Sequence, residues 1–181
     1  MNLRDKIHSY ILSHLVDPTE RTIGVEEECF LYTNKNRRLP VNPCDEFSAT
    51  DLLAIMNENV GNNGIYSLEP GGQLEWSSLP YRDLNTLFSA LSQHKQALIE
   101  VVNANDLRII SYGVEPNFAP NDIDLINQLK YQLMNANMEQ NGTMGQWMMR
   151  NTTSVQVNFD ITSERDLEDM IFVADCVQPV C

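Results

Sequence analysis

The stretch Tyr66–Ser78 reads Y-S-L-E-P-G-G-Q-L-E-W-S-S and predicts a β-hairpin with one polar face. Two strand-like pieces flank Pro70-Gly71-Gly72, where proline fixes φ and glycine tolerates positive φ, so the chain can reverse sharply. Because side chains alternate along a strand, Gln73 and Glu75 share one side and the apolar side chains face the other. Glu69 lies at the edge of the turn, near the polar side. This pattern indicates either a site for a charged ligand or a solvated hairpin face.

The segment Thr22–Thr33 (T-I-G-V-E-E-E-C-F-L-Y-T) predicts a second strand with acidic side chains. It is rich in residues that favour strands, and most of its apolar side chains alternate onto one face. Glu26 and Glu28 share the opposite face and project in parallel. Two carboxylates so close together are tolerated when water screens both or when a cation lies between them. The face is therefore either a cation site or an exposed strand surface, and Glu27 is expected near a sheet edge or paired.

The remaining segments predict helices and two further strands. Helices are expected at residues 2–16, 48–60, 83–102, 122–140 and from 163 onward, with Gly61-Asn62 ending the second of them. Strands are expected at 107–114 and 152–161. In the last strand, alternation predicts a core-facing set and a polar set, namely Val155, Val157, Phe159 and Ile161 against Ser154, Gln156, Asn158 and Asp160.

Composition limits the class of protein. The chain has 181 residues, 43% of them apolar and 8% aromatic, which is typical of one or at most two soluble globular domains. Twelve basic against 25 acidic side chains give a net charge of −13, which argues against nucleic acid or an anionic membrane as a partner. A bound phosphate would need a cation beside it.

The cysteines and the apolar runs indicate where the chain is expected to work. The four cysteines, at positions 29, 44, 176 and 181, contain no C-x-x-C pair, and the chain starts without an apolar signal region. The longest apolar runs are too short for a membrane span. We therefore expect free thiols and a cytoplasmic location.

The order of predicted elements favours the α+β class. Strands with one apolar and one polar face fit an antiparallel or mixed sheet that is covered by helices on one side and open to ligand on the other. The sequence contains neither a P-loop nor a G-x-G-x-x-G motif.

Three motifs resemble those of the glutamate–cysteine ligases of the plant and proteobacterial type. The family pattern I-G-x-E-x-E matches residues 23–28, and E-P-G-G-Q-x-E matches residues 69–75 without a gap. The family's M-M followed by T-x-x-x-Q-V-N-x-D matches Met148-Met149 and residues 152–160. The motifs occur in family order at similar spacing. One departure is Lys130-Tyr131, where the family has Arg-Tyr.

The resemblance implies a glutamine-synthetase-like fold, in which a curved antiparallel or mixed sheet carries helices on its convex face and the active site on its concave face. It covers nearly all of residues 1–181 but only about the first half of a family member. The chain is therefore expected to be a single N-terminal portion of the catalytic domain, truncated at its C-terminus, with an incomplete half of the sheet. The last helix, still apolar where the chain ends, agrees with this expectation.

The resemblance also implies an ATP- and Mg²⁺-dependent ligase. The γ-carboxylate of L-glutamate would attack ATP to give γ-glutamyl phosphate, and L-cysteine would then displace phosphate to form γ-glutamylcysteine, the first step of glutathione biosynthesis. The implied metal ligands are Glu26, Glu28, Glu69 and Glu75, and of these Glu26, Glu28 and Glu75 are the implied catalytic residues. The implied groups for glutamate or ATP binding are Gln73, Thr152, Gln156 and Asn158.

Two alternatives remain open. One is a related carboxylate–amine ligase that uses another amine acceptor or serves the ergothioneine pathway. The other is an inactive fragment that only binds ligand. For the glutamate–cysteine ligase, the expected partners are the small molecules L-glutamate, L-cysteine and ATP, with no nucleic acid and no membrane.

Overall fold

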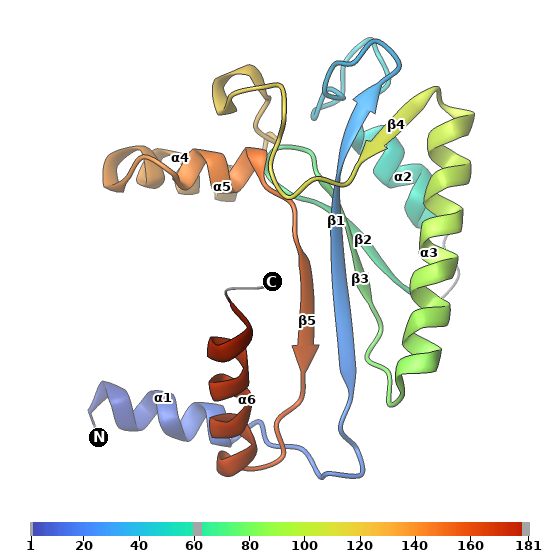
Figure 1. Cartoon of the computed structure of the whole chain (residues 1–181). Coiled ribbons are helices and arrows are strands. Elements are labelled where there is room, and N and C mark those ends of the chain that lie inside the picture. Colours follow the sequence, from blue (N-terminus) through green and yellow to red (C-terminus); the bar gives the residue numbers. More distant parts are fainter. Residues whose placement is uncertain (1, 60–62, 179–181) are drawn as a thin grey trace.

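The fold is arranged around one long central strand. A computed structural model describes residues 2–59 and 63–178. The strand β1 pairs with β3 along one edge and with β4 and β5, one after the other, along the opposite edge, while β2 pairs with the outer edge of β3. All these pairs are antiparallel, and Figure 1 shows β1 at the centre. The strands are β1 Ile23–Thr33, β2 Gly64–Leu68, β3 Leu74–Ser78, β4 Leu107–Ile110 and β5 Val155–Phe159.

Helices connect these strands, and side chains cap the starts of several of them. The side chains of Ser48 and Asp51 bond each other's backbone N–H groups at the start of α2. Asp83 accepts a hydrogen bond from the backbone N–H of Thr86 at the start of α3. The helices of the described chain are α1 Leu3–Leu12, α2 Ala49–Asn59, α3 Leu84–Ala104, α4 Leu129–Asn141, α5 Gly145–Asn151 and α6 Glu164–Val177, together with a 3₁₀ turn at Pro120–Asp122.

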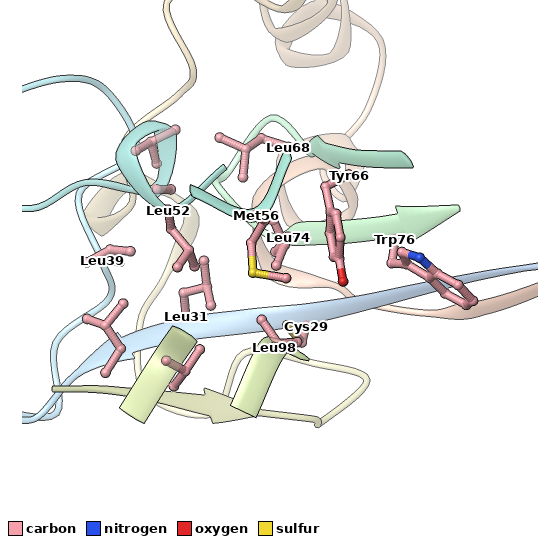
Figure 2. Close-up of a cluster of buried hydrophobic side chains, with 14 of the residues drawn as sticks. Cys29, Leu31, Leu39, Leu52, Met56, Tyr66, Leu68, Leu74, Trp76 and Leu98 are labelled. Carbon is pink, nitrogen blue, oxygen red and sulfur yellow. The ribbon is translucent and has the colours of Figure 1, made fainter. Parts of the chain in front are cut away.

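The hydrophobic core lies between α2, α3 and one face of the sheet. Cys29 and Leu31 of β1 and Leu74 and Trp76 of β3 meet side chains of both helices there (Figure 2). The alternation predicted for β1 and β3 is therefore confirmed for Cys29, Leu31, Leu74 and Trp76, which enter this cluster, whereas Val25 is buried outside it. The α+β class with an open antiparallel sheet is confirmed with it.

The predicted core contacts of β5 are wrong. Val155, Val157 and Phe159 remain 65%, 49% and 55% exposed. Their strand pairs with the first half of β1, whereas the buried side chains that α2 and α3 cover come from the second half of β1 and from its other neighbours. In Figure 1, α2 and α3 lie on one side of β1, and β5 lies on the other.

Several predicted boundaries also differ from the structure. The first helix ends at Leu12 rather than residue 16, and the last strand spans Val155–Phe159 rather than residues 152–161. The fourth helix begins at residue 129 rather than 122, because the preceding segment is held extended against the hairpin turn: Ile126 donates its backbone N–H to the carbonyl of Pro70. The strand β4 ends at Ile110 rather than Val114.

Gly61, Asn62 and Cys181 lie outside the described residues. Cys29, Cys44 and Cys176 are free thiols, as expected. None of the described helices is long and apolar enough to cross a membrane.

Truncation of Leu74 tests the position of the core. Leu74 is 1% exposed and lies inside the cluster, so Leu74→Ala should lower the free energy of unfolding by about 2–5 kcal/mol in urea denaturation. The matched control is Leu129→Ala, at a leucine that is 71% exposed, which should change it by less than about 0.5 kcal/mol. Equal losses in the two variants would contradict this packing.

Candidate active site

The two faces of β1 carry different chemistry. Glu27 faces α3, where one carboxylate oxygen lies 3.0 Å from Lys95 Nζ and the other lies 3.4 Å from His94 Nε2. The expectation that Glu27 is paired is therefore confirmed. Glu26 and Glu28 project from the opposite face, because side chains alternate along the strand. Pairing Glu27 behind the sheet leaves the two neighbouring carboxylates together on its polar face.

Glu28 and Glu75 are direct cross-strand neighbours. Residue 28 of β1 pairs with residue 75 of β3, so their Cβ atoms are expected to lie roughly 5 Å apart. Glu28 accepts hydrogen bonds from the backbone N–H and the Oγ of Ser154, both at 3.1 Å. Glu75 accepts one from Ser67 Oγ at 2.8 Å. Burial, opposed by the Ser154 bonds, raises the pKa of Glu28, and the negative charge of Glu75 raises it further. Two carboxylates thus face each other across adjacent strands.

The amide side chains of β5 extend the same polar face. Gln156 lies opposite Glu26 in the sheet, and its Nε2 donates to Glu28 Oε1 at 3.2 Å. Asn158 lies opposite Gly24, and its Nδ2 donates to Glu26 Oε1 at 3.1 Å. Since both amides bond the carboxylates of β1, the structure brings Glu26, Glu28, Glu75, Gln156 and Asn158 together on one face of three adjacent strands.

Glu69 adds a fourth carboxylate at the end of the hairpin. Its backbone N–H donates to the carbonyl of Gln73 at 2.9 Å, which closes the turn. Burial raises the pKa of Glu69 to about 7, and the nearby charges of Glu75 and then Glu28 raise it in the same direction, while Lys130 opposes them. The carboxylate therefore experiences the negative charge of the same polar face, and Lys130 supplies a cation beside it.

Gln73 and Thr152 occupy different positions from the other predicted residues. Gln73 is 1% exposed, and its Nε2 donates to the carbonyl of Thr152 at 2.9 Å and to that of Met149 at 3.3 Å. Thr152 donates its hydroxyl to the carbonyl of Met148 at 2.7 Å. Both side chains therefore bond to backbone, and together they join the hairpin turn to the connection between α5 and β5.

A buried cluster that the sequence analysis missed lies at the C-terminal end of β1, next to the polar face. Arg38 Nη1 lies 2.7 Å from Glu115 Oε2, and Arg38 Nη2 donates to the carbonyl of Gly71 at 2.7 Å. Tyr32 donates its hydroxyl to the same Glu115 carboxylate. These residues come from β1, the following loop and a distant loop, so no local sequence pattern connects them. The Arg38 bond to Gly71 holds the glycine turn in place. The carboxylates of Glu26 and Glu28 lie nearer the N-terminal end of β1.

The donor set of this face suits a hard divalent cation. Mg²⁺ prefers oxygen ligands and typically uses one or two carboxylates together with phosphate oxygens and water. The polar face supplies carboxylates whose pKa values are raised partly by mutual repulsion, which a cation would relieve. Within residues 2–59 and 63–178, no three His, Cys, Asp or Glu side chains lie close enough together to hold an ion alone. The face therefore offers a carboxylate pair, Glu28 and Glu75, rather than a complete set of metal ligands.

Plant enzymes are among the relatives of this chain. A 114-residue stretch is 32% identical to glutamate–cysteine ligase A, chloroplastic, of Oryza sativa subsp. indica, and covers 63% of this chain and 23% of that protein. Over the same length it is 32% identical to the chloroplastic glutamate–cysteine ligase of Arabidopsis thaliana and 31% identical to that of Medicago truncatula, covering 22% of each. The matched stretch thus spans less than a quarter of these relatives.

The names of these relatives contradict the expected cytoplasmic location. All three proteins are described as chloroplastic. The expectation rested on cysteine spacing and the absence of an apolar signal region, and neither feature distinguishes the cytoplasm from another reducing compartment. The prediction of a cytoplasmic protein is therefore wrong.

A family model matches a much longer part of the chain than the three relatives above do. It describes the glutamate-cysteine ligase family 2 and covers residues 22–180. This range includes β1, the hairpin and β5, and therefore every carboxylate and amide of the polar face. The chain belongs to the glutamate-cysteine ligase family 2.

Proposed function

We propose that this chain carries part of the active site of an ATP- and Mg²⁺-dependent ligase that joins L-glutamate to L-cysteine. The product would be γ-glutamylcysteine, whose formation is the first step of glutathione biosynthesis. One observation carries the proposal: Glu26, Glu28 and Glu75 gather with Gln156 and Asn158 on a single face of three adjacent strands. Family membership and the names of the relatives support it.

The reaction needs an activated carboxyl group, because a free carboxylate and an amine form a salt rather than an amide. The γ-carboxylate oxygen of glutamate would attack the terminal phosphorus of ATP and release ADP. The amine of cysteine would then attack the γ-carbonyl carbon of γ-glutamyl phosphate, lose a proton and expel phosphate. The first step brings two anions together, so positioning and charge neutralisation dominate catalysis.

The carboxylates of the polar face are proposed to hold the cation. Bound Mg²⁺ would supply neutralisation of the phosphate charge and fix the direction of attack. Glu26, Glu28, Glu69 and Glu75 would serve as ligands in pairs, such as Glu28 with Glu75, and each pair would share its ion with phosphate oxygens. Of the four, Glu26, Glu28 and Glu75 lie on the strands themselves. This agrees with the net charge of −13, since an acidic chain does not attract a polyanion without a cation.

The neutral polar residues are proposed to orient the carboxylates and the substrates. Asn158 and Gln156 donate to Glu26 and Glu28, so they fix the carboxylate planes. Each amide group keeps a carbonyl oxygen that can accept a hydrogen bond from the ammonium group of glutamate or from ATP. Gln73 and Thr152 would contribute by holding the hairpin turn next to β5.

The open antiparallel sheet supports, as a further part of the proposal, a glutamine-synthetase-like arrangement with the active site opposite the helical layer. Helices α2 and α3 cover one face, and the proposed ligands occupy the other. Residues 1–181 would then form part of one catalytic domain. The relatives' much greater length is consistent with this view.

Replacement of one proposed metal ligand tests the reaction. In the full-length protein, Glu75→Gln should reduce ADP release from ATP, glutamate and cysteine at least about a hundredfold, because a neutral amide is a poor ligand for Mg²⁺. The matched control is Glu168→Gln, at an exposed carboxylate of α6, which should leave the rate unchanged. ADP release by Glu75→Gln near the wild-type rate would defeat the metal assignment.

Calorimetry on residues 1–181, combined with a turnover assay on the full-length protein, separates the ligase from a protein that only binds ligand. Saturable binding of Mg-ATP to this chain, together with glutamate- and cysteine-dependent ADP release by the full-length protein, supports the proposal. Binding without any such turnover in the full-length protein would replace the ligase with the binding-only alternative.

The pKa of Glu69 gives a test that needs no turnover. It is raised from an ordinary value of 4.5 to about 7, so the folded state holds this proton more tightly than the unfolded state does. The stability that this group contributes should therefore be present below pH 4.5 and be lost as the pH rises to about 7.

The carboxyl carbon of Glu69, followed by NMR titration, should show a lower pKa in Glu75→Gln than in the wild type, because one repelling charge is gone. Addition of Mg²⁺ with ATP should lower it further. Glu168→Gln should leave this pKa unchanged. A pKa that is the same in Glu75→Gln would show that Glu69 does not sense the polar face.

A further inference from the structure

One buried side chain of α3 contacts three adjacent strands of the sheet. His94 is 6% exposed and lies on the face opposite the proposed metal ligands. Its Nδ1 lies 2.6 Å from the hydroxyl of Tyr66 in β2. Its ring stacks on Trp76 of β3, with centroids 4.5 Å apart and planes 6° apart. Its Nε2 lies 3.4 Å from Glu27 Oε2 in β1. Both ring nitrogens and the ring face are therefore each used on a different strand.

The three contacted residues form one row across the sheet, which we call the back row. Tyr66 is the direct cross-strand partner of Trp76, and Trp76 is the direct partner of Glu27. Direct partners in antiparallel strands place their side chains on the same face. His94 thus spans the whole back row, from β2 through β3 to β1.

The adjoining row on the polar face contains the carboxylate pair of the proposed site. We call it the front row: Ser67 pairs with Glu75, and Glu75 pairs with Glu28. Each member is the chain neighbour of one member of the back row, so its side chain projects from the other face. Ser67 Oγ also donates to Glu75 Oε1 at 2.8 Å.

The two rows are mechanically linked, because successive side chains of a strand leave opposite sides of one backbone. A strand that is held at its back-row residue cannot rotate its front-row residue freely. Trp76 has little freedom of its own, since its Nε1 lies so close to Gly64 that a Cβ atom there would clash. Contacts to the back row therefore determine the directions in which Glu28 and Glu75 leave the sheet.

His94 differs from the other buried residues of α3 in the kind of contact it makes. Hydrogen bonds have a preferred direction, whereas hydrophobic contacts do not. Lys95 also contacts Glu27, at 3.0 Å, but its side chain is half exposed and such a pair contributes little. The other buried residues of the helix are apolar, namely Leu87, Ala90, Leu98 and Val102.

We propose that His94 is a positioning residue for the Glu28–Glu75 pair. It would touch neither the metal nor the substrates, and it would hold the back row so that both carboxylates keep the directions needed to share one ion. The inference rests on the proposed function, since it concerns the use of that pair. Loss of the two nitrogen contacts would loosen the pair and weaken metal binding without removing a ligand.

Calorimetry tests this role without turnover, by titrating residues 1–181 with the Mg²⁺ complex of a non-hydrolysable ATP analogue. His94→Phe keeps an aromatic ring for Trp76 but removes both nitrogens. We expect its Kd to rise about tenfold, with the number of sites per molecule unchanged. A purely structural role would reduce the fraction of folded protein, and so the number of sites, while leaving Kd unchanged. In the full-length protein, KM for Mg-ATP should rise about tenfold and kcat should stay within about threefold of the wild type.

Three further variants complete the test. His94→Gln keeps an amide that can donate towards Glu27, so its Kd should rise about threefold or less. Val102→Ala, at a position of α3 that is 3% exposed, is the matched loss of core packing and should leave Kd unchanged. Tyr66→Phe removes only the hydroxyl that faces His94 and should raise Kd about threefold, and it replaces His94→Phe if circular dichroism shows that the latter does not fold.

The outcomes separate this inference from the proposed function. An unchanged Kd in His94→Phe, or in Tyr66→Phe where it is the replacement, would overturn the positioning role, as would an equal rise in Val102→Ala. If Glu75→Gln binds the complex as the wild type does, or if the wild type does not bind it, the proposed metal site fails and this inference fails with it. Weak binding by Glu75→Gln together with an unchanged Kd in His94→Phe would disprove the positioning role alone.

Discussion

The alternation of side chains along β1 is the constraint on which the rest of the structure depends. This strand has a neighbour on both edges, so its rotation is fixed by hydrogen bonds on two sides. A slip of one residue would bring Glu26 and Glu28 into the core and expose Cys29 and Leu31, which the buried cluster beneath α2 and α3 does not permit. Hydrophobic burial on one face therefore determines where the carboxylates of the other face lie.

Electrostatic repulsion is the consequence of that arrangement. Glu28 faces Glu75 across the strands, and Glu69 at the hairpin turn senses both charges. Hydrogen bonds from Ser154 and from the amides of β5 offset part of this repulsion, but they leave the carboxylate pKa values raised. In the proposed function, a divalent cation, and with it a phosphate ligand, would relieve this repulsion.

Local sequence patterns predicted the parts of the fold that depend on local physics. The hairpin and the two faces of β1 follow from turn chemistry and period-two alternation, and the pairing of Glu27 follows from a charge placed on an apolar face. The burial of Gln73 and the cluster of Arg38 with Glu115 depend on contacts between distant segments, so no local pattern reveals them. The exposure of Val155 and Val157 was missed because alternation shows which face a side chain joins, but not whether a helix covers that face. His94 was missed for a similar reason, since only the three-dimensional contacts show it between Tyr66, Trp76 and Glu27.

The most direct test is a crystal structure of residues 1–181 grown with Mn²⁺ and a non-hydrolysable ATP analogue, with anomalous diffraction used to locate the metal. Mn²⁺ replaces Mg²⁺ at oxygen ligands and scatters anomalously. An anomalous peak within coordination distance of the carboxylates of Glu28 and Glu75, on the face of the sheet opposite α3, is the predicted result. A peak on the α3 side of β1, or one remote from both carboxylates, would contradict the central claim that this polar face is a metal and phosphate site.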